Sequence, residues 1–373
     1  MPNSIEQELV RCATARAWLA GDVGHAPPTR PGPAAVMRVS AHPADDAFVV
    51  QQVFQPAFSV LRRMSGGRLA AEGHWAERAH PAIEGFEALA DGRTDLAPCY
   101  TNWRADDYPM TQLLALPGLF PNSEIGTEVA ERLYSKYLRA EFEKPGLLMG
   151  RLKATGAYHL FSHKPVRRLA DLRGMSIGVN AGLDSRIAVA LDAAPVALSS
   201  VELLPAFLAG SIDAVSLADG SADVFGVGVK APYRIEVGVS MMNMEFGLSE
   251  AFVRRLPPDL QSVLNDWLRA EAQAETQILY GLGGALAREK FAAAGCAFLE
   301  LETRDRRELD ERMAVLADRA TRELDRRSLP ASDFVAEARA LARSLMVKDA
   351  NQLMRDAIER PIRLLPASGA VPA

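Results

Sequence analysis

Aromatic, imidazole, amide and hydroxyl side chains gather in the loops that follow the predicted strands of this sequence. In the first half of the chain they are His42, His74, Trp75, Tyr100 and Trp103. In the second half they are Tyr158, His159, Asn180, Ser200 and Asp219, followed by Asn243 and Glu245 where the chain returns. Because open α/β sheets bind ligands beyond the carboxyl ends of their strands, we expect these loops to form one site. Such groups suit a neutral or amphipathic small molecule held by a few hydrogen bonds.

Metal binding and catalysis are the alternative chemistries for these residues. His74, His80 and Cys99 have no helical ligand spacing and no evident fourth ligand, so we expect no metal and no cofactor. Trp103 fits the core of the first half as well as it fits a cleft. The sequence contains no GxSxG, HExxH, P-loop or GxGxxG motif, so an enzyme is the least favoured hypothesis.

The elements that would position these residues alternate between strands and helices. Strands are predicted near residues 36–40, 68–74, 94–100, 147–152, 157–162, 176–179, 196–198 and 214–217, mostly with helices between them. Pro257 and Pro258 open a long helix that runs to about residue 294. Alternating strands and helices indicate an α/β fold with mainly parallel sheets. The chain has 373 residues, which favours two lobes over a single core.

Composition narrows the possible partners. The net charge is −5, from 42 basic and 47 acidic residues, which argues against binding nucleic acid. Cys12, Cys99 and Cys296 lie far apart and are expected to be small buried or free thiols. The sequence contains no apolar run of about 18 residues, the length that would suggest insertion into a membrane. The stretch CATARAWLAG is too polar for the core of a secretory signal, so no signal peptide is recognised.

Five blocks in the chain resemble the substrate-binding proteins of tripartite ATP-independent periplasmic (TRAP) transporters, in their dicarboxylate-receptor-like family. They are SGGRLAAEGHWAERAHPAIEGFEALADGRTDLA, LLALPGLFPNSE, HKPVRRLADLRGMSIGV, APVALSSVELLPAFLAGSIDAVS and AFVRRLPPDLQSVLNDW, in the family's order over residues 36–325. The resemblance implies a two-lobed, type II-like periplasmic-binding-protein fold with hinge strands and one long helix. It also implies a receptor that captures an organic acid or aromatic compound between the lobes and delivers it to the permease subunits. The implied location is the periplasm, while the missing signal keeps a cytosolic ligand sensor as the alternative.

The chain departs from this family at Gly178. The resemblance implies an arginine there, which would clamp a ligand carboxylate with two parallel hydrogen bonds. The second basic position matches Tyr158, and a polar position near the end of the block matches Leu217. We therefore expect simple dicarboxylates to bind weakly and a flatter or bulkier ligand to use the space. Alternatively, Arg104 or Arg186 reaches into the cleft and restores the clamp.

The predicted domain organisation follows from the order of elements. Residues 1–35 are expected to be a poorly ordered leader whose removal up to residue 33 leaves the melting temperature nearly unchanged. Residues 36–156 and 242–282 form the first lobe, and residues 157–241 and 283–325 form the second. Residues 326–373 form a C-terminal helical region that packs on the lobes.

Overall fold

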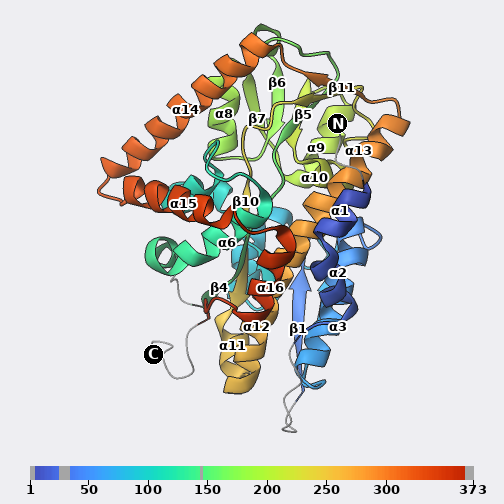
Figure 1. Cartoon of the computed structure of the whole chain (residues 1–373), viewed down its shortest axis with the longest axis vertical. Coiled ribbons are helices and arrows are strands. Elements are labelled where there is room, and N and C mark those ends of the chain that lie inside the picture. The colour runs from blue at the N-terminus through green and yellow to red at the C-terminus, as the bar shows by residue number, and fades with distance from the viewer. Residues whose placement is uncertain (1–4, 25–33, 143–145, 366–373) are drawn as a thin grey trace.

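The computed structural model describes residues 5–24, 34–142 and 146–365, which fold into two α/β lobes (Figure 1). The lower lobe in the figure holds a five-stranded sheet in the order β2-β1-β3-β10-β4. The upper lobe holds a six-stranded sheet in the order β11-β9-β5-β8-β6-β7. Two separate sheets flanked by helices confirm the predicted two-lobed α/β architecture.

The sheet of the first lobe combines parallel and antiparallel strands. Its strands are β1 (Ala35–Ser40), β2 (Leu69–His74), β3 (Leu96–Pro98), β4 (Leu147–Ala154) and β10 (Asn243–Ser249). β1 pairs in parallel with β2 and β3, whereas β10 runs antiparallel to β3 and β4. The prediction of a mainly parallel sheet is therefore wrong on the β10 side. The reason is topological, since β4 leads towards the second lobe and β10 returns from it.

The sheet of the second lobe is mixed for the same reason. Its strands are β5 (His159–Ser162), β6 (Ser176–Val179), β7 (Ala194–Ala197), β8 (Ala214–Leu217), β9 (Tyr233–Glu236) and β11 (Ala297–Glu300). β5 is antiparallel to β8 and β9, while β6 is parallel to β7 and β8. β5 is the strand by which the chain enters this lobe.

Helices connect the strands and cover the sheets. In the first half they are η1 (Val50–Phe54), α3 (Gln55–Met64), η2 (Ala82–Glu84), α4 (Gly85–Ala90), η3 (Thr101–Arg104), α5 (Pro109–Gln112), η4 (Leu113–Ala115), α6 (Ser123–Leu133), η5 (Tyr134–Leu138) and α7 (Arg139–Phe142). After β5 they are η6 (Leu169–Leu172), α8 (Leu183–Ala190), α9 (Ser200–Leu208), α10 (Asp219–Val224), α11 (Glu250–Arg255), α12 (Pro258–Glu275), η7 (Thr276–Leu282), α13 (Gly283–Ala293) and α14 (Thr303–Asp325). The long helix predicted after Pro257 is thus the run of α12, η7 and α13.

Before α14 the described chain crosses between the lobes three times, and after α14, which packs on α8, it returns to the first lobe with α15 (Ala331–Leu345). Residues 155–158 and 237–242 link the two sheets, and η7 joins α12 to α13. α12 packs on β4 in the first lobe, whereas α13 packs on α10 in the second. A glycine allows α10 to approach the crossing helix, because a Cβ on Gly220 would lie 2.4 Å from the Leu279 carbonyl oxygen. The lobe ranges given above stay predictions. The chain passes from one sheet to the other within these links.

The predicted C-terminal helical region contains two helices. They are α15 (Ala331–Leu345) and α16 (Ala350–Glu359). Asp349 starts α16, because its side chain accepts a hydrogen bond from the backbone N–H of Gln352, and the Gln352 side-chain oxygen accepts one from the Asp349 N–H. α15 packs on α6, and α16 packs on α12.

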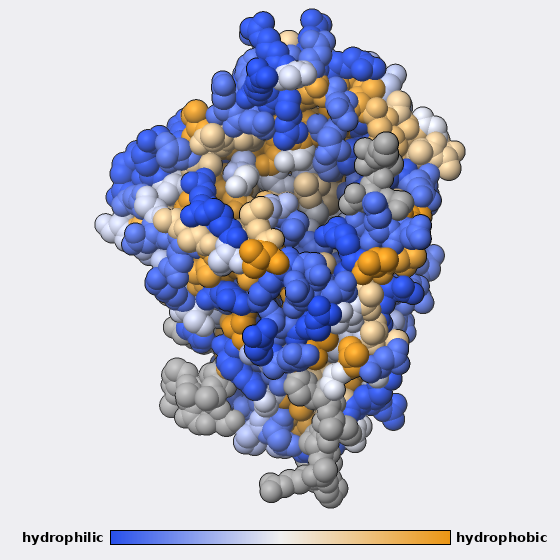
Figure 2. Space-filling view, viewed as in Figure 1, coloured by the Kyte–Doolittle hydropathy of each residue, from blue (hydrophilic) through white to orange (hydrophobic). Residues whose placement is uncertain are grey.

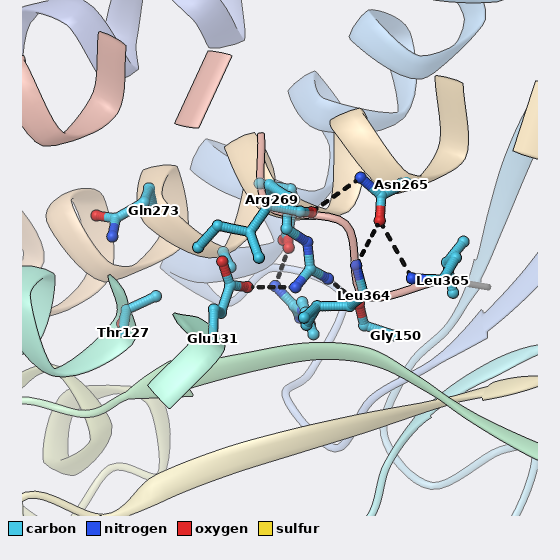
Figure 3. A network of polar contacts seen from close by, with 12 residues as sticks. Thr127, Glu131, Gly150, Asn265, Arg269, Gln273, Leu364 and Leu365 are labelled. Atoms are coloured by element: carbon cyan, nitrogen blue, oxygen red, sulfur yellow. Dashed lines mark hydrogen bonds and ion pairs between the residues drawn. The ribbon is translucent and has the colours of Figure 1, made fainter. Parts of the chain in front are cut away.

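A buried polar network attaches the chain after α16 to α12 (Figure 3). Asn265 donates to the Ile362 carbonyl at 3.0 Å and accepts from the backbone N–H of Leu364 at 3.1 Å. One turn further along α12, the Arg269 guanidinium donates to Glu131 on α6 at 2.6 Å and also to the Gly150 carbonyl on β4. These partners compensate Arg269 for the water that it loses on burial.

The N-terminal segment is packed, which contradicts the prediction of a poorly ordered leader. α1 (Ile5–Arg11) and α2 (Ala13–Ala20) lie beside η7 and α12 (Figure 1). Cys12, Ala15 and Trp18 are buried in the same core as β1 and α12. Their three-residue spacing is the apolar period of a helix, which the proline-rich stretch after it concealed. Residues 1–4 and 25–33 lie outside the described part of the chain.

The face of the molecule drawn in Figure 2 is largely hydrophilic. On the face in Figure 2, apolar side chains form small patches separated by hydrophilic residues. Of the helices within the described residues, none combines the length and apolar character needed to cross a bilayer.

Replacing Trp18 tests the packing of the N-terminal helices. Trp18→Ala should lower the free energy of unfolding by about 3–5 kcal/mol, because a fully buried indole is lost. Val10→Ala is the matched control, since Val10 on α1 is 67% exposed and should change stability by no more than about 0.5 kcal/mol. Urea unfolding followed by circular dichroism measures both. Equal, negligible effects would show that the helices do not stabilise the body.

Candidate functional site

The two lobes touch each other across the cleft between the sheets. The Tyr100 hydroxyl, from the loop after β3, lies 3.0 Å from His42 Nδ1 and also interacts with the Ser200 side chain of the second lobe. Gly182 at the start of α8 lies against Asn102 and Gln112, and a Cβ there would be 2.6 Å from the Gln112 side-chain oxygen. The lobes are therefore in a closed arrangement.

A first cavity, of about 50 Å³, lies between the lobes. It is walled mainly by apolar and aromatic side chains, with one amine and one carboxylate. Its lining includes Ala41, His42, Val49, Phe54, Tyr100, Lys153, Ser221, Val224, Phe225, Met244, Phe246, Glu275, Leu279 and Tyr280. The wall residues come from the loop after β1 and from η1, β3, β4 and β10 of one lobe, from α10 of the other, and from the helix that crosses between them.

Lys153 belongs to a cluster of four fully buried charges between β4 and the long helix. Arg151 pairs with Glu271 and Glu275, and Lys153 pairs with Glu275. Arg151 also lies over the Phe246 ring, with its guanidinium carbon 3.9 Å from the ring centre. Arg151 and Lys153 are two residues apart on a strand, and Glu271 and Glu275 are four apart on a helix, so each pair shares one face.

Burial sets the protonation of this cluster. Desolvation raises the pKa of Glu271 to about 7, despite the charge of Arg151. The pKa of Glu275 is lowered from its usual value, because the attraction of Arg151 and Lys153 outweighs its desolvation. Desolvation also lowers the pKa of Lys153, which Glu275 opposes. Near neutral pH the cluster is therefore balanced or carries one net positive charge, according to the state of Glu271.

A second cavity, of about 20 Å³, lies on the other face of β10 and is polar. It is lined by Thr101, Asn102, Thr111, Gln112, Ala115, Ala181, Leu183, Asp184, Met242, Asn243 and Glu245. Asp184 comes from the second lobe, and Glu245 comes from β10 in the first. Burial raises the pKa of Asp184 and of Glu245 to about 7, because no cation compensates for the lost water.

A protein-family model supplies the decisive comparison with known proteins. Residues 44–323 match the model described as bacterial extracellular solute-binding protein, family 7. The chain belongs to this family. The match confirms the resemblance to TRAP substrate-binding proteins, a family of binding proteins rather than enzymes.

Solved structures of TRAP solute-binding proteins share the fold of this family member at low sequence identity. One from Rhodoferax ferrireducens, with copurified benzoate, has a TM-score of 0.77 and 18% identity, covering 83% of this chain and 98% of its own. One from a marine metagenome, specific for aromatic acids and bound to 3-hydroxybenzoate, has a TM-score of 0.77 and 15% identity, covering 84% and 99%. One from Bordetella bronchiseptica, with bound mandelate, has a TM-score of 0.71 and 20% identity, covering 83% and 99%. No curated protein matches the chain in sequence.

The predicted site residues of this solute-binding protein fall into several places. Tyr100 and Asn243 line the two interlobe cavities, as do the further candidates His42 and Glu245. Tyr158 and Asn180 are buried at the lobe junction, where the Asn180 amide lies 3.1 Å from the Met242 sulfur.

The other predicted residues do not line either cavity. His159 and Asp219 line a separate groove of about 230 Å³ on the hinge side, together with Arg11 of α1. Trp103 is partly exposed on η3, and His74 pairs with Glu72 at the surface.

Two further residues of the sequence hypotheses have structural roles. Trp75 stacks on Phe54 and Phe58 in the core of the first lobe. His80 bonds to Ser40 at 2.7 Å, as a hydrogen-bonded histidine. The described residues contain no group of histidine, cysteine and acidic side chains that could hold a metal.

Gly178 does not leave an empty place for a ligand, contrary to the prediction. A Cβ on Gly178 would lie 2.7 Å from Ile212 and 2.9 Å from Leu203, so apolar side chains under α9 fill that space. Neither proposed substitute cation lines the two interlobe cavities, although Arg186 lines a neighbouring pocket of about 360 Å³ between residues of both lobes. Arg104 pairs with Glu87, and Arg186 pairs with Glu323 at 2.9 Å, both at the surface.

Lys153, Tyr280 and Asp184 are the lining residues that the sequence reasoning missed. The segment Met149–Ala154 was predicted as a strand only up to residue 152, so Lys153 was not considered. Its alternation with Arg151 and the spacing of Glu271 and Glu275 were a usable signal of facing charge pairs. Nothing in the local sequence places Tyr280 beside Lys153, because the two are brought together by the crossing helix.

The buried carboxyl of Asp184 should make stability depend on pH. Its pKa is 3.8 when unperturbed and about 7 in the folded protein, so the folded state holds a proton that the unfolded state releases. The stabilisation that wild type has relative to Asp184→Asn should therefore fall as pH rises from about 4 to about 7, by up to about 1.4 kcal/mol per pH unit. Urea titrations of both proteins across this range measure the difference. A difference that does not change with pH would contradict the prediction.

The Tyr100 hydroxyl should stabilise the closed arrangement. Tyr100→Phe removes its contacts with His42 and Ser200, which should cost about 0.5–1.5 kcal/mol per hydrogen bond and favour the open form. Fluorescence transfer between labels on the two lobes measures closure. Tyr137→Phe is the matched control, since it removes a tyrosine hydroxyl bound to Glu337, away from the cleft. Equal closure in all three proteins would show that the contact does not matter.

Proposed function

We propose that this protein captures a small organic acid with an aromatic ring between its lobes and delivers it to a TRAP-type permease. The carrying observation is that the Lys153 amine lines an interlobe cavity whose other walls are largely aromatic and aliphatic. Such a cavity offers apolar surface to a ring and one cation to a carboxylate. The relatives that bind benzoate, 3-hydroxybenzoate and mandelate support this class of ligand.

The charge balance of the buried cluster supports the binding of one carboxylate. With Glu271 protonated, Arg151 and Lys153 face only the charge of Glu275. A single ligand carboxylate at Lys153 then neutralises the cluster, whereas a second carboxylate has no cation among the residues lining either cavity. We expect dicarboxylates to bind weakly because a second cation is lacking among these lining residues, and not because of the space at Gly178, which apolar side chains fill.

Ligand entry requires the lobes to separate or the lining side chains to move. The first cavity measures about 50 Å³, and a cavity of about 150 Å³ is needed to hold benzene. Tyr100 and Tyr280 occupy part of the space between the lobes in this closed arrangement. Hinge motion about the three crossings, followed by closure over the ligand, provides the necessary change.

The family role extends this proposal to location and chemistry. The family is extracellular, so we place the protein in the periplasm, with the cytoplasm as the alternative that cell fractionation tests. We also propose that it catalyses no reaction, as expected of a transport receptor. Release of unmodified ligand after prolonged incubation, followed by mass spectrometry, tests that part.

Calorimetry with a panel of acids tests the ligand class. Benzoate and mandelate should bind more tightly than succinate or malate, because only an aromatic ring uses the apolar walls. A submicromolar affinity for succinate combined with no binding of the aromatic acids would sink the proposal.

Removing the cation tests the role of Lys153. The double variant Lys153→Met with Glu275→Gln removes one charge of each sign, so the net charge of the cluster is unchanged and the Arg151–Glu271 contact remains. Its dissociation constant for benzoate should rise by about 10- to 100-fold, since a hydrogen bond to a charged group contributes about 1.5–3 kcal/mol. Arg104→Ala is the control, because this arginine lies outside both cavities, and it should leave the affinity unchanged. An unchanged affinity in the double variant would overturn the assignment of Lys153.

A further inference from the structure

Three polar atoms in the second interlobe cavity lack a hydrogen-bond partner. They are the Asn102 Nδ2 donor and the acceptors Asp184 Oδ2 and Asn243 Oδ1. All three residues are more than nine-tenths buried. An unpaired polar group shielded from water costs about 1–3 kcal/mol, so three of them around one cavity indicate an incomplete site.

The neighbouring bonds define what each group offers. Asn243 Nδ2 donates to Glu245 Oε1 at 3.0 Å, which fixes the amide so that its oxygen is the free end. Glu245 Oε2 accepts from the Thr101 hydroxyl at 3.2 Å, so both oxygens of this carboxyl are engaged. The other oxygen of Asp184 lies 3.5 Å from the Ser240 hydroxyl. The cavity therefore offers a donor from Asn102, an acceptor from Asn243, and Asp184, which also faces the Asn180 side chain and accepts when ionised or donates when protonated.

We propose that this cavity is a subsite for a hydroxyl group of the ligand, held by Asp184, Asn243 and Asn102. A hydroxyl has one proton to donate and two lone pairs to accept with, so it can use both kinds of group at once. The volume of about 20 Å³ matches one water-sized group. The proposal rests on the proposed capture of an aromatic acid and specifies that acid as a hydroxy acid.

Other ligand groups fit this cavity less well. A carboxylate only accepts hydrogen bonds, so it would leave the Asn243 oxygen unpaired, and none of the described residues lining the cavity is a lysine, arginine or histidine to compensate its charge. An apolar group would leave the three atoms unpaired. An ammonium group suits the acceptors but leaves the Asn102 donor without a partner.

The two cavities are neighbours, because they share two segments of the chain, and the proposal requires the ligand to reach around the end of β10 at Asn243. In the loop after β3, Tyr100 lines the first cavity and the adjacent Thr101 and Asn102 line the second. On β10, Met244 lines the first cavity, and its neighbours Asn243 and Glu245 line the second. The carboxylate at Lys153 and the hydroxyl at Asp184 are thus placed on opposite sides of β10.

The experiment compares acids that differ only in a hydroxyl group. Isothermal titration calorimetry measures the affinities of benzoate, the three hydroxybenzoates and benzene-1,3-dicarboxylate for wild type, Asp184→Ala and Asn102→Ala. The best hydroxybenzoate should bind wild type about 10-fold more tightly than benzoate, as expected for hydrogen bonds to a buried polar pair. That gain should shrink to about 2-fold or less in both variants, while benzoate affinity changes little. Asp107→Asn, an exposed carboxylate outside the cavities, is the matched control and should keep the full gain.

The outcomes separate this proposal from the proposed function. Binding of benzoate without any gain from a hydroxyl, or a gain that survives in both variants, overturns the subsite and leaves the aromatic-acid receptor standing. Tight binding of the dicarboxylate also overturns the subsite. Absence of binding by every acid overturns both. If Asp184→Ala does not fold, Asn102→Ala decides alone, since it removes one uncharged donor.

Discussion

The four buried charges between β4 and α12 are the interaction on which the rest of the structure depends. Removing Arg151, Lys153, Glu271 and Glu275 from water is costly, and the cost is compensated only while strand and helix stay in register. This requirement holds the long helix on the sheet of the first lobe. It also presents the Lys153 amine to the cavity between the lobes, so one cluster serves both packing and recognition.

The same helix carries polar residues along most of its buried length. Arg269 and Asn265 tie it to α6, to β4 and to the chain after α16. At its other end η7 passes beneath α10, where glycine permits close contact. Because α1 and α2 pack on this helix as well, the segments at both ends of the chain stabilise the element that joins the lobes.

The order of strands and helices was enough to predict an α/β fold, since those signals are local, while the two lobes were expected from the chain length and the family resemblance. The burial of Trp18 was not predicted, because the apolar period around it is short and a proline-rich stretch follows it. The candidate site was predicted only in part. Strand-end positions led to Tyr100 and Asn243. Lys153 lines one cavity and Asp184 the other because of tertiary contacts that no spacing in the sequence reveals. Gly178 was misjudged because its local motif does not show that Leu203 and Ile212 fill the space beside it.

The position of the cation affects how a ligand can close the lobes. A ligand favours the closed form only through contacts that it makes more strongly there than in the open form. Lys153 belongs to the first lobe, on the edge strand β4 and in an ion pair with Glu275 of the long helix, so a carboxylate bound to it alone contributes little to closure. The contacts that distinguish the closed form must come from the second lobe, which contributes Asp184 to one cavity and α10 to the other. A ligand that reaches Asp184 therefore connects the lobes in a way that a simple carboxylate does not.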